Sequence, residues 1–484
     1  MVDSFNLVDE PWIPVIYNDG RCQKVGIQTA LSDAGSIRQV AATNPMDRVA
    51  VLRFLLAVLY WCQGNPPQQQ GKDQILSAGR FPGDWFGKLK THRGCFNLSG
   101  AGKRFYQHQE QGPGKRRMRP TTDLLQEIPT DNNFWHFRHS TDSMNGLCFP
   151  CCAMGLLRLP LFSVSSLSGP NWPRLKAGIN GKPPIYVIPV AKSLISTLLL
   201  NWTAREQLGT PTWDDADPVP EAGGQVPILE GMTLLSRHVR LSDPETCGGA
   251  CIACGDIPGS LVKTCCYQSA GERQNDRWTD PHVIYRTEQG EPETRIPMRA
   301  PDMTKSSSKF GKPWTDLLEK LLLVHPGPIS LFVVGFATDK AKNIDVREFI
   351  WDLPCARREQ GSSADESVKQ WRNRCENLPL MIAERLGVKE PRRCSQSAAA
   401  AYAVQPHIEA RLFRRVADLA AGGDAVWQAA AKEYQTLLAA VAASLAPGFT
   451  TQALRRREEI CEIMPKVSPK PPSAPPKPAR KGGC

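Results

Sequence analysis

The chain has 484 residues, which is too long for one ordinary hydrophobic core, and we expect two or three domains. Basic residues outnumber acidic ones by 59 to 48, but five of the resulting +11 charges lie in residues 465–484, which contain no acid. The rest of the chain is only mildly basic, so any nucleic-acid surface has to be a local patch.

The sequence contains neither a signal peptide nor a membrane span that we recognise. The N-terminal residues are partly acidic where a signal peptide has a basic region and an apolar run. The longest apolar stretches fall short of the roughly 20 residues that cross a bilayer. We therefore expect a cytoplasmic protein without a membrane anchor.

Residues 1–361 combine short β-type runs, helices and long loops, which predicts a mixed α+β domain. The expected strands lie at residues 12–17, 185–190 and 329–336. The clearest helix covers residues 45–61, where Thr43 or Asn44 can cap and Pro45 suits the first turn.

Two stretches of this domain, residues 103–122 and 138–147, read as long loops. Loops of this length in a compact domain often have a function. The first contains the basic run 115–119, which suits phosphate contacts, although a merely solvated loop explains it equally well.

The composition changes at residue 362, after which Ala, Leu, Arg, Glu and Gln recur with helical spacing. We expect helices at residues 364–386, 395–421, 424–445 and 448–463. Short connections between antiparallel helices predict a four-helix bundle over residues 362–464. Residues 465–484 are basic and rich in Pro, and we expect them to be a disordered tail.

Two cysteine pairs are the strongest chemical signal. Without an export signal, sixteen cysteines indicate a reducing compartment, where clustered thiols hold metal more often than disulfides. Cys148 and Cys151 form one CxxC knuckle, and Cys251 and Cys254 form a second one. Four thiolates close a tetrahedral Zn²⁺ site with no open position, which predicts a structural zinc between remote segments. The alternative is four idle or buried cysteines.

Other cysteines complicate this assignment. Cys152 and Cys247 are adjacent thiols that compete for a place among the ligands, whereas the Cys265-Cys266 pair has no partner at knuckle spacing and suits the core. No Walker A, HExxH, GxSxG or Rossmann glycine pattern occurs, so we expect a protein that is not an enzyme. His136 and His139 are close in sequence, but incidental histidines explain them better.

An aromatic and basic segment precedes the first knuckle. Its members suited to stacking on bases or contacting phosphates are Phe134, Trp135, Phe137 and Arg138. Burial of the aromatic rings in the core is an equally good explanation.

The opening residues FNLVDEPWIPV, at 5–15, resemble the N-terminal signature of the CasA family, the large subunits of the type I-E CRISPR complex called Cascade. The spacing of the cysteine knuckles, a helical C-terminal region and the chain length resemble this family as well. The resemblance implies a subunit that binds double-stranded target DNA at a short flanking motif, the PAM, and starts strand separation so that guide RNA can pair. The implied partners are guide RNA, target DNA, the repeated backbone subunit and small subunits of Cascade, and a helicase-nuclease effector.

The resemblance also suggests roles for individual residues. Residues 134–147 resemble the loop that anchors the subunit near the 5′ end of the guide, and 335–341 resemble a minor-groove wedge. In the wedge, Asp339 and Lys340 stand where many members have Asn and Gln, and Ala341 follows.

A second DNA-contacting region is implied by the same resemblance. Ser168 and Gly169 correspond to a PAM-contacting loop that is richer in glycine in relatives. The PAM lysine of the family falls near residue 269, where Lys263 and Arg273 are the nearest cations, and we favour Arg273.

Two other functions remain open at this stage. The chain suits the large subunit of another RNA-guided complex, or an unrecognised zinc-dependent nuclease. A closed four-thiolate site favours the binding subunits, because it predicts one zinc and no cleavage.

The predicted bundle is testable in isolation. A fragment beginning near Gly361 and ending at residue 464 should be soluble and helical and should melt cooperatively, as followed by circular dichroism. An unfolded fragment would mean that these helices depend on the N-terminal domain for their core.

Overall fold

The computed structural model describes most of the first 353 residues and parts of the C-terminal region. The described ranges are 5–100, 102–107, 116–128, 146–163, 183–214, 226–235, 238–268, 278–288, 294–297, 329–339, 342–353 and 450–461, with single positions between 428 and 443. The chain divides into two compact units. One comprises Met1–Met303, Lys309–Leu318 and Leu331–Ile350, and the other Thr304–Ser308, Glu319–Ser330 and Trp351–Cys484.

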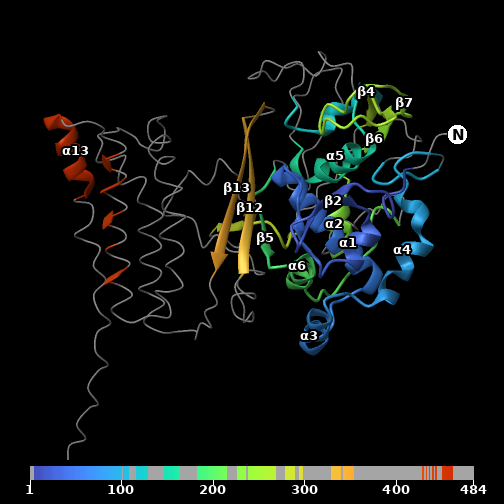
Figure 1. Cartoon of the computed structure of the whole chain (residues 1–484), viewed down its shortest axis with the longest axis horizontal. Helices are drawn as coiled ribbons and strands as arrows, with labels where there is room; N and C mark the ends of the chain where they lie inside the picture. The colour runs from blue at the N-terminus through green and yellow to red at the C-terminus, as the bar shows by residue number, and fades with distance from the viewer. Residues whose placement is uncertain are drawn as a thin grey trace, which may run out of the picture. The chain divides into compact units, whose positions relative to one another are not determined.

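Helix α2 (Pro45–Gln63) runs through the core of the first unit (Figure 1). The Asn44 side chain accepts a hydrogen bond from the Met46 amide at 2.9 Å and caps the helix, and Gly64, with a φ of +79°, ends it. Every residue from 49 to 61 is buried, so protein surrounds this helix on all sides. The predicted helix at residues 45–61 is confirmed, with Asn44 as its cap.

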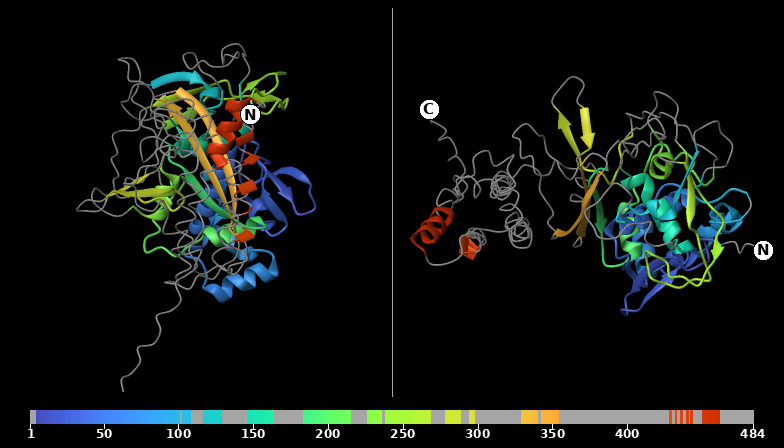
Figure 2. Two further views of the ribbon diagram at one scale, coloured as in Figure 1. Left: turned by 90° about the vertical axis from the view of Figure 1, so that its left-hand side faces the viewer. Right: turned by 90° about the horizontal axis from the view of Figure 1, so that it is seen from above.

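Three small sheets belong to this unit (Figure 1). In the first, β1 (Ile13–Tyr17) lies between β2 (Cys22–Val25) and β3 (Ile37–Val40), and in the second, β9 (Thr264–Gln268) lies between β4 (Arg116–Pro120) and β6 (His238–Leu241). In the third, β12 (Ile329–Asp339) lies between β13 (Lys342–Leu353) and β5 (Tyr186–Val190), and Figure 2 shows β12 and β13 side by side in both views. Two hairpins, β7 (Glu245–Thr246) with β8 (Ser260–Leu261) and β10 (Tyr285–Glu288) with β11 (Thr294–Pro297), complete the described strands.

The other helices of this unit are shorter than α2. They are α1 (Ile27–Ser32), α3 (Gln69–Ala78), α4 (Gly87–Thr91), α5 (Phe149–Phe162), α6 (Leu194–Asn201) and α7 (Ile228–Thr233), with 3-10 turns at Gly83–Phe86, Arg93–Phe96 and Thr121–Leu124. Within the described residues, none of the helices combines the length and the apolar character needed to cross a membrane.

The three predicted strands are confirmed. The loop predicted at residues 103–122 is wrong in part, and one predicted strand is longer than expected. The stretch 103–122 is not one loop, because its basic run contributes to β4, which pairs with β9 from Arg116 opposite Gln268 to Pro120 opposite Thr264. Such pairing with a strand about 150 residues away leaves no local pattern in the sequence. The third strand is also longer than predicted, because β12 continues past residue 336 to Asp339 beside β13.

The described residues of the second unit from 428 onwards are mostly helical. Helix α13 (Thr451–Cys461) lies within the predicted helix 448–463, and the described positions between 428 and 443 have helical backbone. The predicted helices at 364–386 and 395–421, the boundary at residue 361 and the tail lie outside the described residues, so the four-helix bundle remains a prediction.

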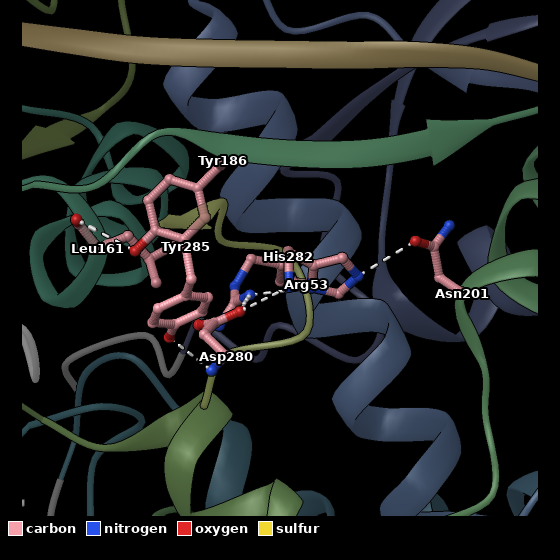
Figure 3. A network of polar contacts seen from close by, with 7 residues as sticks. All are labelled: Arg53, Leu161, Tyr186, Asn201, Asp280, His282 and Tyr285. Carbon is pink, nitrogen blue, oxygen red and sulfur yellow. Dashed lines mark hydrogen bonds and ion pairs between the residues drawn. The ribbon is translucent and has the colours of Figure 1, made fainter. Parts of the chain in front are cut away.

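A buried polar network interrupts the apolar core next to α2 (Figure 3). Arg53 of α2 donates two hydrogen bonds to the carboxylate of Asp280, at 2.6 and 2.7 Å, and both side chains are at most 5% exposed. A third contact joins Arg53 to Nδ1 of His282 at 2.9 Å. Because a guanidinium only donates, Nδ1 accepts, and the proton lies on Nε2, which donates to Asn201 at 3.1 Å.

These contacts fix the ionisation of the network. Burial, and then the charge of Arg53, lower the pKa of His282 from its ordinary 6.5 to about 3. Burial alone would raise the pKa of Asp280, but Arg53 outweighs it, and the pKa is lowered. Arg53 and Asp280 are therefore charged at neutral pH, and His282 is neutral.

This ionisation predicts a pH dependence of stability that depends on His282. The unfolded imidazole binds a proton below pH 6.5, whereas the folded one stays neutral down to about pH 3. Stability contributed by His282 should therefore fall as the pH drops through this window, by roughly 1.4 kcal/mol per pH unit. At pH 7 the wild-type chain should be more stable than His282→Gln, and denaturant titrations at pH 7, 6 and 5 should show the gap narrowing. A constant gap would contradict the assigned neutral state.

Candidate metal centre

The first cysteine pair lies at the start of α5. Cys148 immediately precedes the helix, and Cys151 is in its first turn, with Pro150 at a position that needs no amide donor. Residues three apart in a helix lie on the same face, so the two thiols lie close together at this end. A helix N-terminus also favours negative charge, which suits a thiolate.

The second pair forms a tight turn between β7 and β8. The Cys251 amide donates to the Asp256 carbonyl at 2.7 Å, and the Gly255 amide donates to the Cys251 carbonyl at 2.9 Å. Gly255 has a φ of +79°, a conformation in which an L side chain is strained. Glycine after the knuckle therefore lets the chain fold back and orient both thiols to one side.

Backbone contacts bring these remote turns together. Leu147 and Val262 exchange two hydrogen bonds of 2.9 Å directly beside the first knuckle. A Cβ on Gly146 would lie 2.1 Å from the Val262 carbonyl oxygen, so only glycine fits there. The Lys24 ammonium on β2 adds an ion pair of 2.5 Å with Asp256. The position of the four thiols is thus set by both segments and by β2.

The four thiols have the spacing of a tetrahedral metal site. All four Sγ atoms lie within 4.8 Å of one another, and those of Cys148 and Cys254 are 3.6 Å apart. Zinc–sulfur bonds of about 2.3 Å put the sulfurs of a tetrahedral site about 3.8 Å apart. A disulfide needs about 2.05 Å, and all four cysteines are free. In the part of the chain that the structure describes, no other group of three or more His, Cys, Asp or Glu side chains lies close enough together to hold a metal ion.

The thiols also influence one another's ionisation. Hydrogen bonds from the Cys148 and Cys151 thiols lower the pKa of Cys251. Contacts with Cys148 and Cys251, together with burial, raise the pKa of Cys151. A bound cation would favour the thiolate form of all four cysteines.

The remaining candidate cysteines are outside the cluster. Cys152 is fully buried, with its Sγ directed at the Leu147 carbonyl, and Cys247 is half-buried. Cys265 is buried in β9, as expected for a core residue, whereas Cys266 is partly exposed.

Most of the expected nucleic-acid contacts lie outside the described residues. These are Phe134, Trp135, Phe137, Arg138, Ser168, Gly169, Arg273, Lys340 and Ala341. Lys263 is described, and its ammonium pairs with Glu245 at 2.8 Å. Asp339 is the last residue of β12. Lys263 directly follows Val262, which pairs with Leu147 beside the first knuckle.

The sequence did not lead us to two buried arginines, one in α2 and one in α5, that form ion pairs inside the first unit. Arg53 forms the network described above, and Arg158 of α5 is fully buried and pairs with Asp47 at 3.3 Å and Glu127 at 3.0 Å. An arginine inside an otherwise apolar helix is the signal that could have identified both, because such a charge requires a buried partner.

Comparison with known proteins identifies the family. The family model of CRISPR-associated protein Cse1 matches residues 6–461, which is nearly the whole chain. A curated relative, CRISPR-associated protein CasA/Cse1 of Thermus thermophilus, is 27% identical over 208 residues, and the match covers 41% of this chain and 40% of the relative's length.

Solved structures agree with this fold. The structure of Thermus thermophilus CasA (Cse1) matches with a TM-score of 0.69 at 21% identity, over 96% of this chain and all of that one. A chain of a CRISPR RNA-guided surveillance complex matches with a TM-score of 0.67 at 17% identity, over 95% of this chain and 99% of that one. At these identities, the structural matches support the fold alone.

The fold and the family match together define a CRISPR-associated protein. The chain belongs to the family of CRISPR-associated protein Cse1, also called CasA. The family indicated by the opening motif and the cysteine knuckles is therefore confirmed.

The four-thiol centre predicts a metal-dependent fold. Cys148→Ser and Cys254→Ser should each lose bound metal, measured by elemental analysis, and lower the melting temperature by about 10 °C or more, because metal ligation is coupled to folding. Cys22→Ser is the matched control, since Cys22 is exposed and outside the cluster. Full metal content and wild-type stability in both cluster variants would contradict the assignment.

Proposed function

We propose that this chain is the large subunit of a type I-E CRISPR surveillance complex. In this role it binds the PAM on double-stranded DNA, promotes strand opening so that guide RNA can pair with the target, and offers a landing surface to the helicase-nuclease. The observation that carries the proposal is the family match over residues 6–461. Pairing with the guide would supply sequence recognition, and the protein would start the opening of the duplex.

The metal in the four-thiol centre is proposed to be a structural zinc. A tetrahedral set of four thiolates suits Zn²⁺, and it leaves no coordination position for a water or a substrate. The role of the ion would be to clasp the start of α5 to the β7–β8 loop. No hydrolysis is expected from such a site, which favours a binding subunit over a nuclease.

The hairpin of β12 and β13 is the best-supported candidate for strand opening. β12 is buried from residue 331 to 336 and continues to the polar Asp339, and β13 begins at Lys342. Lys340 and Ala341 are therefore the two residues that join neighbouring strands. Side chains inserted into the minor groove hold DNA bent or unstacked, and we assign this role to Asp339, Lys340 and Ala341.

This assignment predicts a selective defect in strand opening. Replacing Asp339, Lys340 and Ala341 together by glycine should weaken capture of double-stranded target by the assembled complex roughly ten- to hundredfold, because opening a base step costs a few kcal/mol. A target with a pre-opened bubble should bind normally, since it needs no opening. Binding of both targets is measured by filter retention or mobility shift.

The control removes an acidic and a basic side chain from an exposed turn elsewhere in the first unit. Asp19→Gly with Arg21→Gly changes the turn between β1 and β2, where these side chains lie 3.8 Å apart and are both exposed. This variant should bind both targets like the wild type. Equal loss on both targets in the hairpin variant would assign its residues to general DNA affinity, and no loss would exclude them from the mechanism.

A further inference from the structure

Helix α2 contacts the sheet of β13, β12 and β5 through two arginines. Arg53 lies beneath β5, with its guanidinium carbon 5.3 Å from the centre of the Tyr186 ring. Arg48, five residues earlier, lies over the Phe332 ring of β12 at 4.8 Å and pairs with the Glu348 carboxylate of β13. A single guanidinium thus touches both strands of the hairpin.

The position of β5 is fixed independently of the hairpin. The Val187 amide donates to the His282 carbonyl at 2.7 Å, and the Ile284 amide donates to the Ile185 carbonyl at 3.2 Å, so residues 282–284 run along β5. His282 is itself bound to Arg53, as Figure 3 shows. β5 is therefore a fixed reference strand against which β12 lies.

Strand β13 is less constrained than β5 and β12. In the sheet order, β13 follows β12 and lies at the edge of the described strands. An edge strand has a hydrogen-bonded neighbour on one side only, so a side-chain contact from outside the sheet helps to keep it in one position. Among the described residues, Arg48–Glu348 is an ion pair that joins β13 to a helix.

We propose that Arg48 is a positioning residue that holds the β12–β13 hairpin on α2, so that the Asp339 end meets the duplex in one fixed orientation. This inference rests on the proposed function of the hairpin. Without Arg48, the hairpin would have to be ordered when DNA binds, and that entropic cost would lower affinity for a target that must be opened.

Arginine suits this role better than any other residue. Its planar guanidinium can stack on a ring and pair with a carboxylate at once, whereas a lysine ammonium presents a point charge. The side chain of Arg48 is 21% exposed and that of Glu348 is 44% exposed, so neither is essential to the core. Replacement should leave the fold intact and change only the restraint on the hairpin.

The test uses the full-length chain in its assembled complex, with Arg48→Gln, Glu348→Gln and the two combined. Arg38→Gln is the control, because Arg38 is an exposed arginine on β3. Two measurements are made for every variant. Amide hydrogen exchange compares the peptides of β12 and β13 with those of β1, and binding assays compare double-stranded with pre-opened targets.

The expected result is faster exchange in β12 and β13 and unchanged exchange in β1. Capture of the double-stranded target should weaken by about fivefold, as expected for one cation–π contact and one partly exposed ion pair. Capture of the pre-opened target should stay unchanged, Arg48→Lys should restore part of the loss, and the combined variant should equal Arg48→Gln, because the two residues share one interaction.

The outcomes separate this inference from the proposed function. Unchanged exchange in β12 and β13 would overturn the positioning role of Arg48, whatever the binding results. Faster exchange with normal capture of both targets would also overturn it, because the restraint would then have no effect on opening. If Arg48→Gln weakened capture of both targets equally, the positioning role would also be refuted. If instead the variant with glycine at 339–341 captured both targets normally, the function proposed for the hairpin would be refuted.

Discussion

A guanidinium buried in the middle of an apolar helix has to be neutralised where it lies, and Arg53 imposes this constraint on the first unit. Its carboxylate partner, Asp280, is 227 residues away in sequence and must be brought to α2. Removing one partner of such a pair costs about 3–5 kcal/mol, because the other charge stays buried. Residues 280–285 are therefore held at α2, and with them β5, against which the β12–β13 hairpin lies.

The four-cysteine centre imposes a second long-range constraint of a different kind. It ties the start of α5 to a turn about 100 residues later, and α5 is itself held on α2 by Arg158. The ion pairs orient elements within the core, whereas the thiols join two segments at its surface. A metal there would stabilise the arrangement through the folded state and would need no part in chemistry.

Local patterns predicted the elements that depend on local sequence. The cap and apolar run of α2 and the strands β1, β5 and β12 follow from capping and β-branched runs, and the CxxC spacing predicted which thiols meet. Strand β4 could not be predicted, because an arginine-rich run becomes a strand only when β9 pairs with it. The same holds for Asp280 and His282, which acquire their roles from Arg53 and show no motif of their own.

If this chain works inside an RNA-guided complex, it should be recovered from the cell together with guide RNA and partner subunits. The chain is purified with its native partners under gentle conditions, and the bound RNA is sequenced while the subunits are weighed by native mass spectrometry. We expect a stoichiometric assembly that contains one CRISPR-derived RNA of uniform length. Recovery of the chain alone, or with RNA unrelated to CRISPR repeats, would contradict it.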